Sequence, residues 1–144
     1  LWGTNTYLVG SGEVAVIDPG PDMPDHLDAI LGALQPGERI SHILLTHTHM
    51  DHLALAPGLK DATGAEIWGH NVPDGPFAFD RHLADGDRIQ GPDWELEAIH
   101  TPGHIDDHLS FGFEGVCLTG DHVMGWSTSV VSPSPARRTS TSRL

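Results

Sequence analysis

The chain has 144 residues, enough for one domain with its own hydrophobic core and too few for two full domains. Its formal net charge of −13, from 20 acidic and 7 basic residues, disfavours a nucleic-acid partner, because lysine and arginine supply most of the affinity for a phosphate backbone. Since Cys117 is the only cysteine and no apolar stretch approaches the roughly 20 residues of a membrane span, we expect a cytoplasmic protein without disulfide or membrane partner.

The first part of the chain predicts a small sheet covered by a helix. Residues 6–9 and 14–17 are short apolar runs, and the glycine-rich turn between them predicts a β-hairpin. Apolar residues at positions 27, 30, 31 and 34 recur at helical spacing, which predicts an amphipathic helix over the sheet. Asp18, at the end of the second strand, is either a turn residue or a hydrogen-bond partner for a metal-bound histidine. Residues 40–45 predict the next strand.

Directly after this strand, residues 46–52 contain three histidines and an aspartate. Imidazole and carboxylate groups are ligands that Zn²⁺ prefers in proteins. Alternation along an extended loop would direct His47, His49 and Asp51 to one side. The neighbouring His52 would then diverge from Asp51 and serve a different ion. The segment therefore predicts the floor of a two-metal site.

The second half continues the alternation of helix and strand. Residues 53–59 predict a short helix that ends near Pro57, residues 65–69 a strand, and residues 71–87 a surface loop.

Three further strands follow this loop. Residues 94–99 alternate apolar and acidic side chains, which predicts a half-buried strand, and the turn after it presents His104. Residues 109–113 and 116–118 predict a hairpin in which Cys117 is buried. The second of these strands leads directly to Asp121.

Composition changes abruptly near the end of the chain. Residues 132–144 are rich in serine, proline and threonine, lack acidic residues and show no periodicity. Such a segment cannot bury enough apolar surface to offset its ordering entropy. We therefore expect one domain over residues 1–131 and a disordered tail over residues 132–144.

Three expected strand ends thus deliver metal-type ligands, each beside glycine or proline. In chain order, the motifs His47-x-His49-x-Asp51-His52, Thr101-Pro102-Gly103-His104 and Thr119-Gly120-Asp121 resemble the metallo-β-lactamase superfamily of metal-dependent hydrolases. The resemblance spans roughly residues 5–131. It implies an α/β fold, the αββα four-layer sandwich, of which this chain would hold the N-terminal part only. Segments 103–108 and 120–128 are most similar to the β-lactamase-like protein 2 group.

The resemblance also implies a set of ligands for two zinc ions. One ion is held by His47, His49 and His104, the other by Asp51 and His52, and Asp121 bridges the two. Asp51 is in addition the implied catalytic residue, which orients the attacking water or shuttles its proton. The family pattern includes one more histidine after the bridging aspartate, and no histidine follows His122 here. We therefore expect a C-terminally truncated chain with an unequal pair of metal sites.

The implied function is hydrolysis by a zinc-activated water. The superfamily handles thioesters, β-lactams, lactones and phosphodiesters, and the ligands do not distinguish among them. The alternatives are a thioester hydrolase resembling glyoxalase II, an endoribonuclease acting on single-stranded RNA, and an inactive metal-binding fragment. The negative charge favours a small-molecule substrate over RNA. Candidate substrate-binding residues are His122, Trp126 and Ser127.

Overall fold

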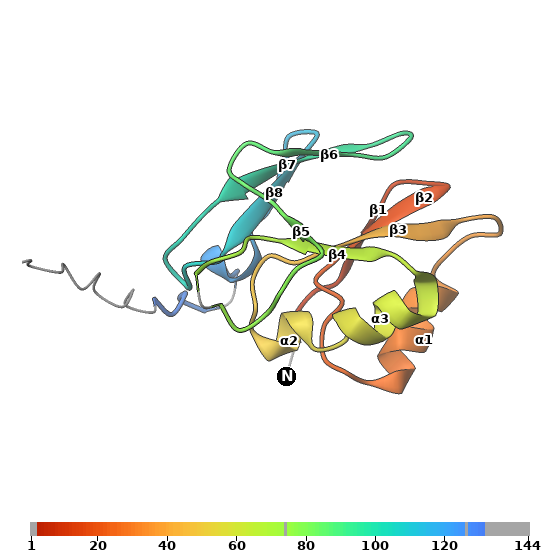
Figure 1. The fold of residues 1–144 in the computed structure, drawn as a ribbon, viewed down its shortest axis with the longest axis horizontal. Helices are drawn as coiled ribbons and strands as arrows, with labels where there is room; N and C mark the ends of the chain where they lie inside the picture. Colours follow the sequence, from red (N-terminus) through yellow and green to blue (C-terminus); the bar gives the residue numbers. More distant parts are fainter. Residues whose placement is uncertain (1–2, 74, 126, 132–144) are drawn as a thin grey trace, which may run out of the picture.

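The structure, a computed structural model, describes residues 3–73, 75–125 and 127–131. Two β-sheets face each other, and the helices α1 (Pro24–Gly32), α2 (Met50–Leu53) and α3 (Ala56–Thr63) lie on the outer face of the first sheet (Figure 1). The predicted α/β class is confirmed. The described residues form three of the four expected layers, namely the helices and the two sheets. None of the helices in this part of the chain is long and apolar enough to cross a membrane.

The first sheet has five strands, in the order β1 (Tyr7–Val9), β2 (Glu13–Ile17), β3 (Arg39–Leu44), β4 (Glu66–Gly69) and β5 (Arg81–His82). β1 and β2 form the predicted antiparallel hairpin, and the remaining pairs are parallel. The prediction of a loop over residues 71–87 is wrong at β5, because two polar residues carry no apolar pattern that could signal a strand.

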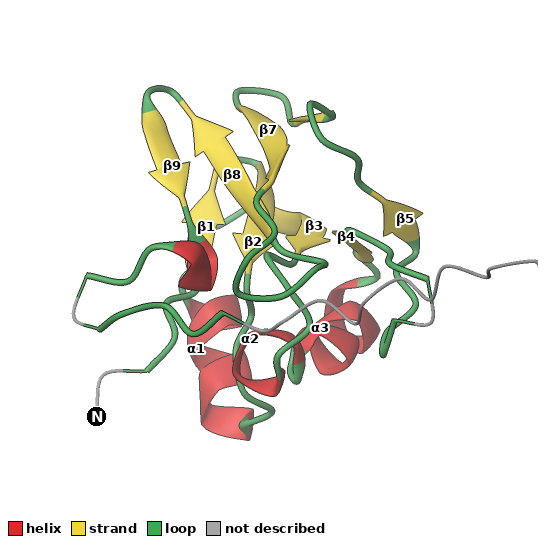
Figure 2. Cartoon of the chain, turned by 90° about the vertical axis from the view of Figure 1, so that its left-hand side faces the viewer, coloured by secondary structure: helices red, strands yellow, loops and turns green. Residues whose placement is uncertain are grey.

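The second sheet is antiparallel, in the order β6 (Arg88–Gln90), β7 (Glu95–His100), β8 (Leu109–Phe113) and β9 (Val116–Leu118). Figure 2 shows both sheets above the helical layer. The predicted strands correspond to β7, β8 and β9, whereas β6 was not predicted. Glu114 and Gly115, with φ of 44° and 81°, form the tight turn between β8 and β9.

Two apolar clusters hold the layers together. One lies between the sheets and includes Ile17 and Leu44, and the other lies between the first sheet and the helices and includes Val16 and Ile43. Neighbouring residues of β2 and β3 thus divide between the clusters, because successive side chains of a strand point to opposite faces. Burial on both faces explains the nearly continuous apolar runs of these strands.

Two local predictions are wrong. Pro57 lies in the first turn of α3 rather than at the end of a helix, since proline lacks only an N–H that has no partner there. α3 ends instead before Gly64, whose φ is 77°. Cys117 is exposed rather than buried, because Leu118 of the outer strand β9 turns towards the core and its neighbour therefore faces outwards.

Candidate metal centre

The loops that follow β3, β7 and β9 meet at one end of the two sheets. The loop after β3 carries His47 and His49 and continues into the one-turn helix α2, which carries Asp51 and His52. The two sheets are joined beside this point, because the Thr46 carbonyl accepts a hydrogen bond of 2.7 Å from the Leu109 N–H at the start of β8. His104 follows β7, and Asp121 lies in the 3₁₀ turn η1 (Gly120–His122) after β9.

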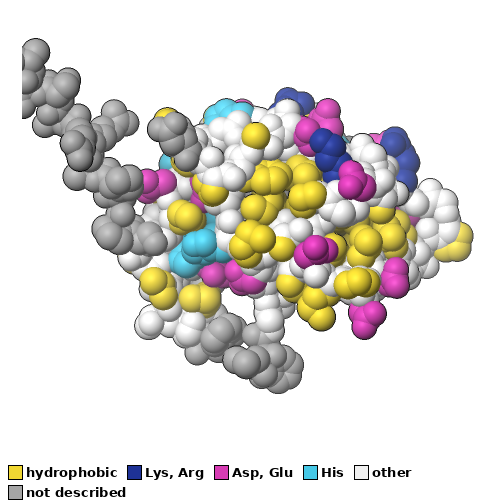
Figure 3. All heavy atoms as spheres, turned by 60° about the horizontal axis from the view of Figure 1, so that its bottom comes forward, with side chains coloured by type: hydrophobic (Ala, Val, Ile, Leu, Met, Phe, Trp, Pro, Cys, Tyr) yellow, Lys and Arg dark blue, Asp and Glu magenta, His cyan; other side chains and the backbone are white. Residues whose placement is uncertain are grey.

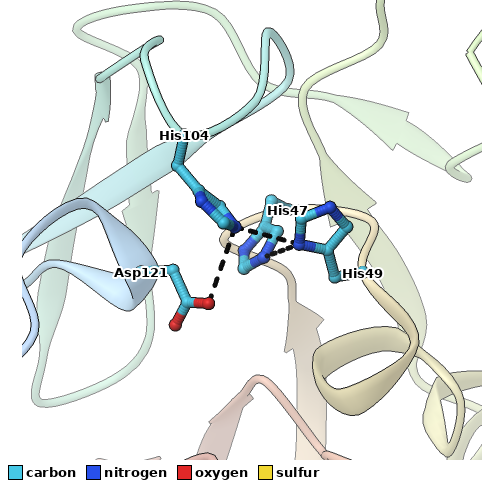
Figure 4. Close-up of side chains that lie close together, drawn as sticks. All are labelled: His47, His49, His104 and Asp121. Carbon is cyan, nitrogen blue, oxygen red and sulfur yellow. Dashed lines mark hydrogen bonds and ion pairs between the residues drawn. The ribbon is translucent and has the colours of Figure 1, made fainter. Parts of the chain in front are cut away.

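Four of the predicted ligands converge on one point. His47, His49, His104 and Asp121 each offer a donor atom, and these atoms all lie within 4.8 Å of one another (Figure 4). His49 Nδ1 is 3.0 Å from His47 Nε2 and 2.9 Å from His104 Nε2. Asp121 Oδ2 is 3.6 Å from His104 Nε2. Residues from three separate loops therefore form a single donor set.

The hydrogen bonds around His47 determine which of its nitrogens carries the proton. The Thr46 hydroxyl donates to Asp18 Oδ2 at 2.7 Å, and it also lies 3.0 Å from His47 Nδ1. Because the single hydroxyl hydrogen is directed to the carboxylate, His47 Nδ1 must donate to Thr46 Oγ1. His47 Nε2 then presents a lone pair to the site.

His104 is oriented in the same way. Its Nδ1 donates to the backbone carbonyl of Val130 at 2.6 Å, so Nε2 presents a lone pair to His49 Nδ1. His49 Nδ1 can donate one hydrogen at most, and it has the lone pairs of both His47 and His104 within 3.0 Å. Three converging nitrogens with too few hydrogens repel one another unless a cation lies between them. The donor set therefore fits a divalent cation.

A second group of ligands adjoins the first. His52 Nε2 lies 3.5 Å from Asp51 Oδ2 and 3.4 Å from Asp121 Oδ1. Asp121 thus faces the two groups with its two different oxygens. The expected divergence of Asp51 and His52 is wrong, because residues 50–53 form helix α2 instead of an extended loop.

The polar environment of His52 leaves its second nitrogen free for a ligand role. Nδ1 donates to Asp18 Oδ2 at 2.8 Å, and Nε2 is buried without a hydrogen-bond partner among the described residues. A buried polar atom without a partner is costly, and a cation would satisfy it.

Burial and neighbouring groups shift the pKa values of three candidate ligands. Burial, and then the neighbouring histidines, hold the pKa of His47 far below its ordinary value, so its imidazole stays neutral. Burial alone would lower the pKa of His52, but the hydrogen bond and charge of Asp18 outweigh it and raise that pKa. Burial would raise the pKa of Asp51, but the hydrogen bond from the Thr4 hydroxyl and the nearby His52 outweigh burial, so this pKa lies below its ordinary value.

Of the two roles that the sequence left open for Asp18, the structure supports that of a hydrogen-bond partner for a candidate ligand. The backbone of Asp18 is in the left-handed region, with a φ of 51°, and the residue is 2% exposed. Its carboxylate accepts hydrogen bonds from the Thr46 N–H at 2.8 Å, the Thr46 hydroxyl at 2.7 Å and His52 Nδ1 at 2.8 Å. One carboxylate thereby orients a ligand from each group, His47 through Thr46 and His52 directly.

We expect Asp18→Asn to weaken Zn²⁺ binding by about 10- to 100-fold, the usual effect of removing an acceptor behind a metal-bound histidine. Asparagine tolerates the left-handed backbone, but its NH₂ group cannot accept a hydrogen bond from Thr46 or His52. Competition with a chromophoric chelator measures the affinity. The control is Asp22→Asn, which removes the same charge from an exposed position. Equal affinity of the Asp18 and Asp22 variants would contradict the role of Asp18.

Of the candidate substrate residues, His122 lies near the site, next to the buried histidine His108. His108 is fully buried, its ring stacks on His47 at 5.0 Å, and burial lowers its pKa to about 3. The ring of His122 lies 5.9 Å from His108, and Ser127 Oγ lies 3.6 Å from Met124 Sδ. Trp126 and the predicted tail over residues 132–144 lie outside the described residues.

A cavity of about 750 Å³ opens next to the second group of ligands. Asp51 and Asp121 line it together with apolar side chains, among them Tyr7, Leu118 and Met124, whereas His122 and Ser127 do not. The Asp51 side chain is 62% exposed. In the space-filling view of Figure 3, histidine and acidic side chains adjoin each other at the surface. The site is therefore accessible from solvent and has an apolar wall.

Sequence analysis did not predict two residues whose hydroxyl groups orient the candidate ligands, Thr46 and Thr4. The Thr46 hydroxyl lies between Asp18 and His47, and its position next to His47 in the sequence was the only available signal. The Thr4 hydroxyl donates to Asp51 Oδ2 at 2.6 Å. Nothing in the sequence connects positions 4 and 51.

Comparisons with known proteins give the same fold and family. Residues 1–143 match the sequence model of the Metallo-beta-lactamase superfamily. Lactamase-like protein aptB of Emericella nidulans is 41% identical over 140 residues, covering 91% of this chain and 43% of that protein. Atrochrysone carboxyl ACP thioesterase dmxR1 of Cryptosporiopsis sp. is 38% identical over 139 residues, covering 91% and 42%. The chain therefore spans less than half the length of these relatives.

Solved structures show the same fold. ETHE1 from Myxococcus xanthus matches with a TM-score of 0.72 and 26% identity, over 85% of this chain and 54% of that one. A metallo-beta-lactamase family protein from Thermus thermophilus matches with a TM-score of 0.74 and 24% identity, over 89% and 57%. The sequence match shows that the chain belongs to the metallo-beta-lactamase superfamily, and the loops after three of its strands meet at one centre rich in histidine and aspartate.

Proposed function

We propose that this chain forms the metal-binding part of a thioesterase that uses two zinc ions. The observation that carries the proposal is the convergence of three ring nitrogens. His49 Nδ1 lies within 3.0 Å of both His47 Nε2 and His104 Nε2, and it can supply a hydrogen to only one of these two contacts. The choice of a thioester is supported by two relatives named atrochrysone carboxyl ACP thioesterase, 38% and 36% identical to this chain.

The first cation would be held by His47, His49, His104 and one oxygen of Asp121, and the second by Asp51, His52 and the other oxygen. Three imidazoles with a carboxylate favour zinc. Two bound cations would lower the pKa of a water molecule in the site and polarise the carbonyl group of a substrate. The second group has fewer donors of its own, so we expect its ion to bind less tightly than the first.

The chain's own residues would orient these groups. The exposed Asp51 carboxylate faces the cavity, where it would hold a water molecule by a hydrogen bond and accept its proton. Asp18 keeps the Nε2 lone pairs of His47 and His52 directed into the site. The apolar wall that Tyr7, Leu118 and Met124 contribute would receive the acyl part of a thioester.

Endoribonuclease activity is the second candidate. Segments 103–108 and 120–128 resemble the β-lactamase-like protein 2 group, and this resemblance alone favours RNA. The net charge of −13 opposes binding of a phosphate backbone.

A cytoplasmic location is also part of the proposal. It is supported by the single cysteine, because a chain that forms no internal disulfide suits a reducing compartment.

A substrate panel tests the proposal. The chain, loaded with Zn²⁺, is offered an acyl thioester, a β-lactam and single-stranded RNA, each with and without a chelator. We expect thioester hydrolysis, and a loss of at least about 100-fold in rate on chelation that added Zn²⁺ restores, because the cations supply several kcal/mol of transition-state stabilisation.

Each of three other results of the panel contradicts a part of the proposal. Cleavage of RNA without thioester hydrolysis would establish the second candidate instead. Two bound zinc ions with no hydrolysis of any substrate would make the chain an inactive metal-binding fragment. Thioester hydrolysis that persists in the chelator would remove the metal mechanism.

A further inference from the structure

The segment before β1 lies against the candidate site. Gly3, Thr4 and Asn5 line the same cavity as Asp51 and His52. The Thr4 hydroxyl donates a hydrogen bond of 2.6 Å to Asp51 Oδ2, across a separation of 47 residues in the chain. A residue remote in sequence thus contacts one of the proposed ligands directly.

Asp51 needs an external partner more than the other proposed ligands do. Its side chain is 62% exposed, whereas that of His52 is 2% exposed. Packing fixes the rotamer of a buried ligand, but an exposed carboxylate on a four-residue helix keeps its rotational freedom. A ligand that must be ordered when the cation arrives binds it more weakly.

The hydrogen bond from Thr4 selects one orientation of that carboxylate. It is accepted by Oδ2, the same oxygen that lies 3.5 Å from His52 Nε2. A carboxylate oxygen has two lone pairs, so accepting one hydrogen bond leaves a lone pair for a cation. Thr4 therefore holds Asp51 in the rotamer that faces His52.

We propose that Thr4 is a positioning residue, which orders Asp51 for binding of the second cation. The inference rests on the two-cation site of the proposed function. The second group consists of Asp51, His52 and a shared oxygen of Asp121, so disorder in one ligand affects a large part of that donor set. Within the described residues, Thr4 makes no hydrogen bond to the three histidines of the first group. Its effect should therefore be confined to the second cation.

A matched control distinguishes this role from simple attachment of the segment. Thr6, two residues further on, also ties the segment down: its hydroxyl donates to the Asp18 carbonyl at 2.7 Å and lies 3.2 Å from His26 Nε2. Thr6→Val loosens the segment by the same chemical change as Thr4→Val, and it removes no contact to Asp51.

The experiment is a Zn²⁺ titration of the chain in competition with a chromophoric chelator, which yields a separate affinity for each ion. We expect Thr4→Val to weaken the second ion by about 10-fold, the lower end of the effect of losing a residue that orients a ligand, and to leave the first unchanged. Thr4→Ser keeps the hydroxyl and should restore the wild-type affinity. Thr6→Val should match wild type at both sites.

Three results would overturn the inference: wild-type affinity for the second ion in Thr4→Val, equal weakening in Thr6→Val, or no restoration in Thr4→Ser. Any of these leaves the proposed function standing, because the wild-type chain still binds two ions. A wild-type chain that binds no second zinc would overturn both the inference and the two-cation function.

Discussion

His47→Ala is expected to lower the proposed thioester hydrolysis by about a thousandfold, equivalent to ~4 kcal/mol of transition-state stabilisation. His47 is 1% exposed, and its Nε2 lies 3.0 Å from His49 Nδ1, so alanine removes one of three converging nitrogens and leaves a cavity in its place. Water cannot replace the ligand in the fixed orientation that Thr46 and Asp18 impose. The first cation should be lost together with the activity.

The measurement is kcat/KM for a thioester, combined with the zinc content of the purified variant. His82→Ala is the matched control, because His82 is an exposed histidine that is not part of the converging donor set. Circular dichroism of both variants separates loss of the ligand from loss of the fold. Undiminished hydrolysis by a folded His47→Ala variant would refute the metal mechanism.

Gly120→Ala is expected to weaken both cations and to lower hydrolysis by about 100-fold, the usual consequence of displacing a catalytic group by about 1 Å. A Cβ at position 120 would lie 2.8 Å from His108 Nε2 and 2.8 Å from Thr46 Oγ1. Neither neighbour can move away, since Thr46 is 1% exposed and bonded to Asp18, and His108 is fully buried. The turn η1 must therefore shift outwards and carry Asp121 with it.

The backbone at Gly120 adds a second cost that a control can isolate. Its φ is 47°, a left-handed conformation that costs an alanine roughly 1–2 kcal/mol. Gly12→Ala is the matched control, because Gly12 has a φ of 71° and nothing within 4 Å of the added Cβ. Both variants should lose stability in thermal unfolding, but only Gly120→Ala should lose zinc. Wild-type zinc affinity in Gly120→Ala would show that the turn accommodates the methyl group.

Sequence patterns were informative where the physical constraint is local. The apolar runs of β2 and β3 predicted strands because both faces of these strands are buried, and glycine and proline marked the turns that present His104 and Asp121. The patterns failed where the constraint comes from a partner strand. β5 and β6 are two and three residues long, and they are strands because β4 and β7 offer them backbone hydrogen bonds.

The sequence by itself identified the candidate ligands, since imidazole and carboxylate side chains at three strand ends admit few roles other than metal binding. The family resemblance implied their division into two groups, and only the tertiary structure decided how the donor atoms are placed and oriented. Helix α2 turns Asp51 and His52 towards the same point, Asp121 faces both groups, and Asp18, Thr46 and Thr4 orient the donors. The physical reason is that hydrogen bonds between residues far apart in the chain depend on distances that only packing establishes. The cluster at residues 46–52 indicated the family from the sequence alone, whereas the contacts that Thr4 and Asp18 make to its side chains became visible only in the structure.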